Sequence, residues 1–167
     1  MGTVFRGNSL IKMFNEFVFF TGMSNLANEC FWQSSIEEIT LPTSLRTISG
    51  SYQFLNCKQL KKIVVLEGLT SVTSIQWIWG SAPSGILIIL PSTVSNLRSD
   101  ALATYGNNNS TVIVCKAVTP PTKTNTSYYQ NVGVVYVPDE SVDAYKTAAG
   151  WSQWASKIKP LSEYEEV

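Results

Sequence analysis

The closest approach to a catalytic or metal-binding cluster in this sequence is a group of acidic residues near the C-terminus. Asp139, Glu140 and Asp143 lie within a few positions of one another, and carboxylates are ligands that Mg²⁺ and Ca²⁺ accept. They also follow Pro138 at the start of a predicted helix, where acidic side chains are stabilising without a metal. We therefore expect Asp139 to be a helix N-cap, and we predict no metal site and no cofactor.

Residues for nucleophilic or general-base catalysis are scarce. Histidine is absent from the 167 residues, which removes histidine-based triads and the common catalytic zinc sites. Cys30, Cys57 and Cys115 are an odd number in a chain long enough to fold without disulfides, so we interpret them as buried apolar side chains. No other nucleophile motif is recognisable, and we predict that the protein is not an enzyme.

Aromatic side chains are the remaining residues that could bind a ligand directly. Trp77 and Trp79 alternate in QWIWG, so they point the same way if the segment is extended. Tyr128 and Tyr129 lie in the loop-like segment 116–133. Such rings can stack on sugars, and they can equally fill an interior. A carbohydrate-binding module that uses these four residues is the alternative function.

Charge and hydropathy exclude several classes of partner. Lys plus Arg and Asp plus Glu each number 12, and no basic run occurs, so we expect neither nucleic acid nor an anionic membrane surface as a partner. The apolar runs stop short of the roughly 20 residues of a membrane helix, so we expect no membrane insertion. The first residues lack a basic segment followed by an apolar one, and we predict no signal peptide in this chain.

The strands that would position any site are predicted from a sequence repeat with a period of 24 residues. Bulky apolar residues recur with this period, each with a partner two positions earlier: Leu41, Val65, Ile89, Ile113 and Val137, preceded by Ile39, Ile63, Leu87, Thr111 and Val135. A fixed period in the twenties is typical of a solenoid, in which each coil buries its apolar side against its neighbours. Because strand side chains alternate, we expect Leu87 and Ile89 inside and Ile86 and Ile88 outside.

A second apolar arc follows each predicted strand. Its members are Leu45 and Ile48, Leu69 and Val72, and Val94 and Leu97, with later anchors at Phe54, Ile78 and Leu102. The sequence therefore predicts an α+β solenoid of about five 24-residue coils with one parallel β-sheet. Residues 1–167 form a single domain, in which residues 23–138 hold the repeats.

The two ends must cover an apolar coil. Apolar residues at helical spacing predict an N-terminal capping helix over residues 8–22: Leu10, Met13, Phe14, Phe17 and Phe20. At the other end, ESVDAYKTAAG predicts a helix that stops at Gly150. Trp151, Trp154 and Ile158 are then expected to fold over the last coil, so residues 139–167 form a helical C-terminal cap.

Two segments carry a resemblance to a known family. The stretch SIEEITLPTSLRTISGSYQFLNCKQLKKIVVL resembles the repeating unit of BspA-like leucine-rich repeats of bacterial surface proteins, and Cys57, Leu60, Ile63 and Val65 match that unit. The segment VYVPDESVDAYKTAAGWSQWASKIKPLSEYEE resembles the closing segment of such proteins of the Bacteroides type. The resemblance covers roughly residues 20–167, and it implies a secreted or cell-surface protein that adheres to host proteins.

The outward sheet positions are the predicted ligand face. By the 24-residue period one column reads Thr40, Val64, Ile88, Val112 and Tyr136, and its neighbour reads Glu38, Lys62, Ile86, Ser110 and Val134. The first column is more apolar than a solvated face requires, which is typical of a contact surface, although β-branched residues also suit strands in general. We predict a monomeric, non-catalytic module that binds a protein through this face, with these ligand-binding residues: Thr40, Lys62, Val64, Ile86, Ile88, Val112 and Tyr136.

Overall fold

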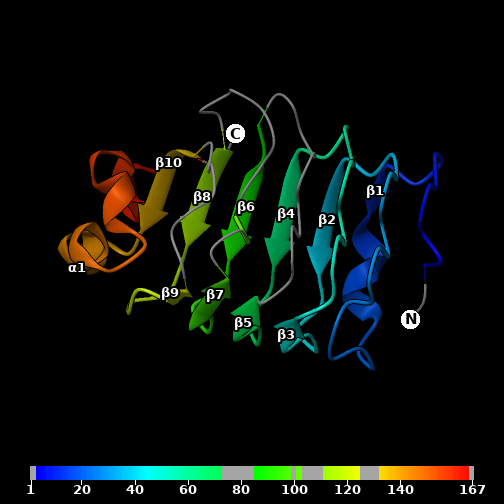
Figure 1. Cartoon of the computed structure of the whole chain (residues 1–167), viewed down its shortest axis with the longest axis horizontal. Helices are drawn as coiled ribbons and strands as arrows, with labels where there is room; N and C mark the ends of the chain where they lie inside the picture. The colour runs from blue at the N-terminus through cyan, green and yellow to red at the C-terminus, as the bar shows by residue number, and fades with distance from the viewer. Residues whose placement is uncertain (1–2, 73–84, 99–100, 103–110, 125–131, 166–167) are drawn as a thin grey trace.

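The computed structural model describes residues 3–72, 85–98, 101–102, 111–124 and 132–165, and it shows a repeat fold built on parallel strands (Figure 1). The larger sheet has seven strands in the order β1-β2-β4-β6-β8-β10-β11, all parallel to their neighbours. Their bounds are β1 Met13–Phe14, β2 Glu38–Leu41, β4 Lys62–Val65, β6 Leu87–Leu90, β8 Thr111–Cys115, β10 Val132–Val137 and β11 Ile158–Pro160. Parallel neighbours need long crossover connections, and the remainder of each repeat supplies them.

A second, smaller parallel sheet runs along the opposite side of the repeats. It has the order β3-β5-β7-β9, with bounds β3 Thr47–Ile48, β5 Ser71–Val72, β7 Asn96–Arg98 and β9 Thr122–Thr124. The prediction of a single sheet is therefore wrong. The second arcs are short, but each is extended enough to exchange backbone hydrogen bonds with the next repeat.

The core lies between the two sheets. Every described member of the predicted second arcs is buried, as are Phe54 and Leu102, while Ile78 lies outside the described residues. From the larger sheet the interior receives alternate residues, such as Ile39, Leu41, Ile63 and Val65. In the first two predicted coils, which contain β2 and β4, the apolar strand residues and the second-arc residues are therefore buried as predicted.

The repeats are also joined by stacking of equivalent side chains. The rings of Phe5 and Phe31 lie 5.1 Å apart at 7° to one another, and those of Phe31 and Phe54 lie 5.1 Å apart at 3°. Equivalent polar residues bond in the same way, since the Asn25 side-chain amide donates to Ser49 Oγ at 3.0 Å and accepts from Ser49 N at 3.1 Å. Each repeat therefore depends on the next one for its contacts, as expected of repeat proteins.

The N-terminal segment differs from its prediction. Residues 8–22 hold strand β1 and a short 3₁₀ helix, η1 (Asn15–Phe19), so the predicted capping helix is wrong. Phe17 is buried, whereas Leu10 is 86% exposed. Met13 pairs with Glu38 and Phe14 with Ile39, so this segment adds one more strand to the sheet. Apolar residues at helical spacing therefore form a strand followed by a short 3₁₀ helix in this segment.

The C-terminal segment is mainly helical, in line with its prediction. It holds η2 Asp139–Ser141, α1 Val142–Thr147, η3 Ser152–Lys157, β11 and η4 Leu161–Glu163. Tyr145, Trp151 and Trp154 are buried among the residues of the last strands. Strand β11 was not predicted; it pairs Ile158 with Val135 and so extends the sheet by one strand.

Two polar anchors fix these aromatic residues. Tyr145 Oη donates to Ala117 O at 2.7 Å, and Trp151 Nε1 donates to Pro121 O at 2.8 Å. The helix α1 ends at Thr147 with Ala148 as its extended C-cap, so the prediction that Gly150 stops it is wrong. Gly150 has φ +79°, and a Cβ there would lie 2.7 Å from Cβ of Lys123. Asp139 is not the predicted N-cap, because its carboxylate accepts a hydrogen bond from Ser162 N at 3.0 Å instead.

No helix in the described ranges is long and apolar enough to cross a membrane.

Candidate functional site

The outward face of the seven-stranded sheet presents two columns of side chains, as the strand register defines them. One column contains Thr40, Val64, Ile89, Val114 and Tyr136. The other contains Glu38, Lys62, Leu87, Val112 and Val134. Of the seven predicted ligand-binding residues, the register places five on this face: Thr40, Lys62, Val64, Val112 and Tyr136.

Ile86 and Ile88 do not lie on the face, and their prediction is wrong. Ile88 pairs with Ile63 and is fully buried, while Ile86 is also buried. The cause is one additional residue between β4 and β6, which makes this repeat 25 residues long. A shift of one residue moves every strand side chain to the other face. Leu87 and Ile89 therefore replace them on the outside.

A sequence signal for this insertion existed in the second arcs. The step from Leu69 to Val94 and from Val72 to Leu97 is 25 residues, not 24, and both pairs are buried at equivalent places. The strand itself carries no such signal, because all five residues from Ile86 to Leu90 are apolar. Any register would therefore have placed apolar side chains in the core.

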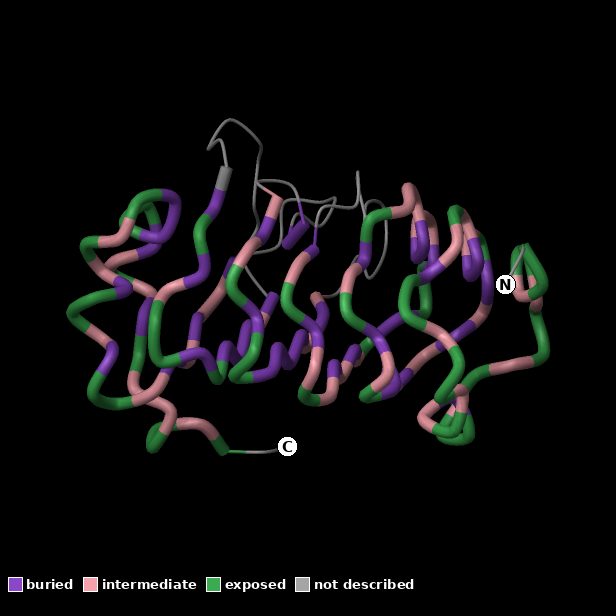
Figure 2. The backbone as a smooth tube through the Cα atoms, turned by 90° about the horizontal axis from the view of Figure 1, so that it is seen from below, coloured by how far each residue is buried: buried purple, intermediate pink, exposed green. Residues whose placement is uncertain are grey.

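The C-terminal end of the outward face is apolar and partly covered. Leu87, Val112 and Tyr136 are half-buried, and Val114 is only 1% exposed. After η4 the described chain runs below the C-terminal end of the repeats in the view of Figure 2. The ring of Tyr164 there packs 5.2 Å from that of Tyr136 on β10. A hollow of about 270 Å³ lies here, lined by Leu87, Val112, Tyr136, Tyr164 and Glu165.

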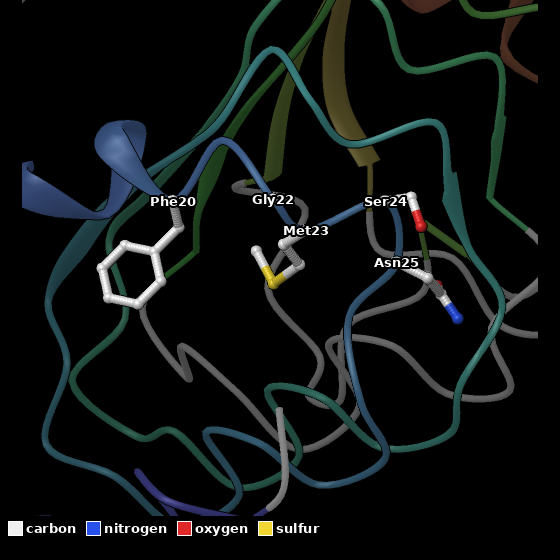
Figure 3. A pocket seen from close by; sticks show the side chains of 5 residues that line it. All are labelled: Phe20, Gly22, Met23, Ser24 and Asn25. Atoms are coloured by element: carbon white, nitrogen blue, oxygen red, sulfur yellow. The ribbon is translucent and has the colours of Figure 1, made fainter.

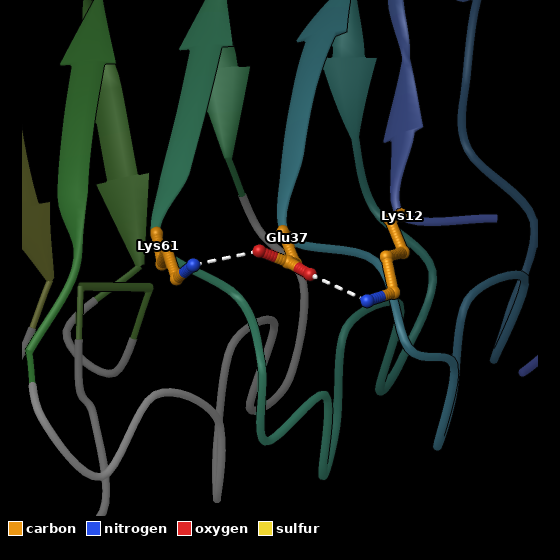
Figure 4. Close-up of polar contacts among 3 residues, drawn as sticks. All are labelled: Lys12, Glu37 and Lys61. Carbon is orange, nitrogen blue, oxygen red and sulfur yellow. Dashed lines mark hydrogen bonds and ion pairs between the residues drawn. The ribbon is translucent and has the colours of Figure 1, made fainter.

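The N-terminal end of the same face is bordered by charged groups. Glu37, which precedes β2, lies between two lysines (Figure 4): its Oε2 is 2.6 Å from Lys61 Nζ and its Oε1 is 3.5 Å from Lys12 Nζ. The hydrogen bond and charge of Lys61 lower the pKa of Glu37, and Glu37 in turn raises the pKa of Lys61. Exposed pairs of this kind contribute little to stability. They make this margin polar, so the apolar part of the face is confined to its other end.

A second hollow, of about 380 Å³, lies in the loop that follows η1 (Figure 3). It is lined by Phe20, Gly22, Met23, Ser24 and Asn25. Its one side-chain amide is already engaged, because Asn25 bonds to Ser49 of the next repeat. None of its described lining residues is charged, so these residues do not supply the convergent polar groups that are typical of a small-molecule site.

The family comparison agrees with this architecture. The model of the BspA type leucine-rich repeat region matches six copies over residues 4–109, which is 106 of the 167 residues. The chain belongs to the BspA-type leucine-rich repeat family. Membership indicates a protein-interaction module in a family that is generally non-catalytic. No curated protein matches the chain.

The extent of the match to the BspA-type repeat corrects the predicted boundaries. The first copy begins at residue 4 rather than near residue 20, in agreement with the strand pairing of Met13 and Phe14. The match ends at residue 109, so it does not extend to the C-terminal segment. The N-terminal residues are thus part of the repeat array.

The cysteines of this BspA-type chain are structural. Cys30, Cys57 and Cys115 are free and buried, as predicted. Burial raises the pKa of Cys30 to about 12 and also raises the pKa values of Cys57 and Cys115. A thiol is reactive as the thiolate, so these three groups are unreactive near neutral pH. Cys57 Sγ instead donates to Phe31 O at 2.9 Å, within the interior.

The aromatic residues of the carbohydrate alternative and possible metal ligands are the remaining candidate site residues. The four aromatic residues of the carbohydrate alternative, Trp77, Trp79, Tyr128 and Tyr129, lie outside the described residues. Among the residues that the structure describes, no three acidic, cysteine or histidine side chains are grouped as metal ligands.

One ionisable side chain of the BspA-type chain is buried beside the C-terminal aromatics. Lys123 is 9% exposed, and its Nζ lies 3.7 Å from the ring centroid of Trp154 and 5.3 Å from that of Trp151. Burial lowers the pKa of Lys123 to about 7, although the ring faces favour the charged form. The unfolded chain therefore binds more protons than the folded one between about pH 7 and 10.5.

We expect the free energy of unfolding to rise with pH just above neutrality. From about pH 7 to about pH 8 the gain from Lys123 is about 1 kcal/mol. The three buried thiols oppose this rise increasingly above that range, because unfolded cysteines ionise near about pH 8.5. Lys123→Met should abolish this rise. Urea denaturation of both proteins at the two pH values measures it, and an equal rise in Lys123→Met would contradict the assignment.

Proposed function

We propose that the protein is a non-catalytic binding module that holds a protein ligand on the outward face of its seven-stranded sheet. The proposal is supported by the apolar stretch of that face, whose half-buried members are Val64, Leu87, Val112 and Tyr136, while Ile89 beside them is only 8% exposed. Side chains of this kind are enriched on contact surfaces when they are contiguous. The described ion pairs lie at the margins of the face, with Glu37 between Lys12 and Lys61 at one end and Lys159 beside Glu163 at the other.

The rigid backbone beneath these side chains favours binding without a large ordering cost. Each strand of the face is fixed by hydrogen bonds to both neighbours, from β2 through β10. Binding groups on a rigid sheet lose little conformational entropy when a partner docks. By the resemblance of the C-terminal segment to surface proteins, we propose an extracellular host protein as the ligand and a cell-surface location for the module.

The experiment places a photoreactive phenylalanine analogue at Leu87, on the face, or at Val118, which is exposed but lies beside the smaller sheet. Each protein is irradiated with a panel of purified extracellular matrix proteins. We expect a discrete cross-linked product only from position 87, and we expect excess unlabelled protein to suppress it. Equal products from both positions, or a product from position 118 alone, would contradict the proposed face.

A further inference from the structure

We propose that the hollow lined by Leu87, Val112, Tyr136, Tyr164 and Glu165 is a subsite for one arginine side chain of the protein ligand. This inference rests on the proposed function, since it specifies the chemistry that one part of the same face recognises. The hollow holds about 270 Å³, which is below the roughly 300–1,000 Å³ of sites for drug-sized molecules. Its size fits a single side chain.

The lining of the hollow combines an apolar floor with two aromatic rings. Leu87 and Val112 are register partners on neighbouring strands and form the floor. Tyr136, on the next strand, and Tyr164, on the C-terminal segment, have ring centroids 5.2 Å apart and planes inclined by 56°. The methylene stem of a long side chain packs well on such a floor, and a flat cation packs on such rings.

The local charge selects a cation. Glu165 is the one charged residue among the described residues that line the hollow, and its side chain is exposed. Two lysines are register partners of lining residues. Lys159 lies beside Tyr136 and is neutralised by Glu163 at 3.0 Å, and Lys62 lies beside Leu87, with Glu38 as its other register partner. The carboxylate of Asp139 lies under the same segment and accepts from Ser162 N. Together these six groups carry a net charge of −2, counted as two lysines against four carboxylates.

Arginine fits these features better than lysine does. Its guanidinium is planar, weakly hydrated and able to stack on a tyrosine ring while its edge donates to a carboxylate. The second ring is held in place beforehand, because the Asp139–Ser162 and Lys159–Glu163 contacts anchor the segment that carries Tyr164. A preformed wall reduces the ordering cost of binding.

The test is an NMR titration of the full chain with N-acetyl-arginine N-methylamide as the probe. The neutral, nearly isosteric citrulline derivative and the lysine derivative serve as comparison probes. We expect saturable shifts of the Leu87 and Val112 methyl signals, with the arginine derivative binding about 3- to 10-fold more tightly than citrulline, as one exposed ion pair and one cation–π contact provide. Glu165→Gln should reduce this preference but not abolish it, because the cation–π contact with the tyrosine rings remains.

Glu140→Gln is the matched control, since Glu140 is an exposed carboxylate of the same end of the chain that does not line the hollow. It should keep the preference for arginine. Equal affinity for arginine and citrulline, an unchanged preference in Glu165→Gln, or shifts only at residues away from the hollow would overturn the subsite. Those results would leave the cross-linking test of the face unaffected, so the two proposals fail separately.

Discussion

Ile88→Lys is expected to unfold the protein, whereas Leu87→Lys is expected to leave it folded. Ile88 is fully buried between its register partners Ile63 and Ile113, which are also fully buried. An ammonium group placed there has no carboxylate to pair with at these neighbouring positions. Burial of such a charge costs several kcal/mol, which is comparable with a typical total stability of roughly 5–15 kcal/mol.

Leu87 is the matched control because it is the adjacent residue of the same strand and differs in the face it occupies. It is half-buried on the outward side, beside Lys62 and Val112. A lysine there can place its ammonium in water. Circular dichroism melting curves of the two variants measure the difference. Equal damage from both substitutions would mean that β6 is covered on both sides, and retention of the fold in Ile88→Lys alone would mean that the register is wrong.

Deletion of residues 139–167 is expected to prevent folding to a stable monomer. The deletion removes the buried side chains of Tyr145, Trp151, Trp154 and Ile158, which pack against the last repeat. Loss of a single buried tryptophan typically costs about 3–5 kcal/mol. The deletion of residues 139–167 also removes β11 and leaves β10 as an open sheet edge, which can pair with other chains.

The control deletion ends the chain after Pro160. It keeps β11 and the buried aromatic residues and removes only η4 and the segment with Tyr164. This shorter protein should stay monomeric and melt within a few degrees of the parent. Light scattering and thermal melting measure both deletions. A stable, monomeric protein that lacks residues 139–167 would show that the C-terminal segment is dispensable for the repeats.

The candidate face shows where reasoning from the sequence succeeded and where it stopped. Thr40 was placed correctly because β2 alternates polar and apolar residues. Lys62 and Val64 were placed correctly because the charged Lys62 begins β4 and requires the outward orientation for its face of the strand. Ile86 and Ile88 were misplaced because an entirely apolar strand fits either orientation. Tyr164 was not predicted as part of the face at all. No periodic pattern connects it to Tyr136, and only the path of the chain after η4 brings the two rings together.

The sequence by itself determined the kind of fold and its apolar interior. Strand side chains that alternate between two faces, together with a repeat period of roughly 20 to 30 residues, are sufficient to predict parallel strands that bury one face. The reason is that each repeat contacts only its neighbours in space. The family followed from the same residues. The tertiary structure decided which side of β6 faces outward, that the N-terminal residues form a strand, and that the C-terminal segment reaches the sheet. Each of these depends on the pairing of a segment with a distant one, and a single additional residue changes that pairing without changing the local pattern.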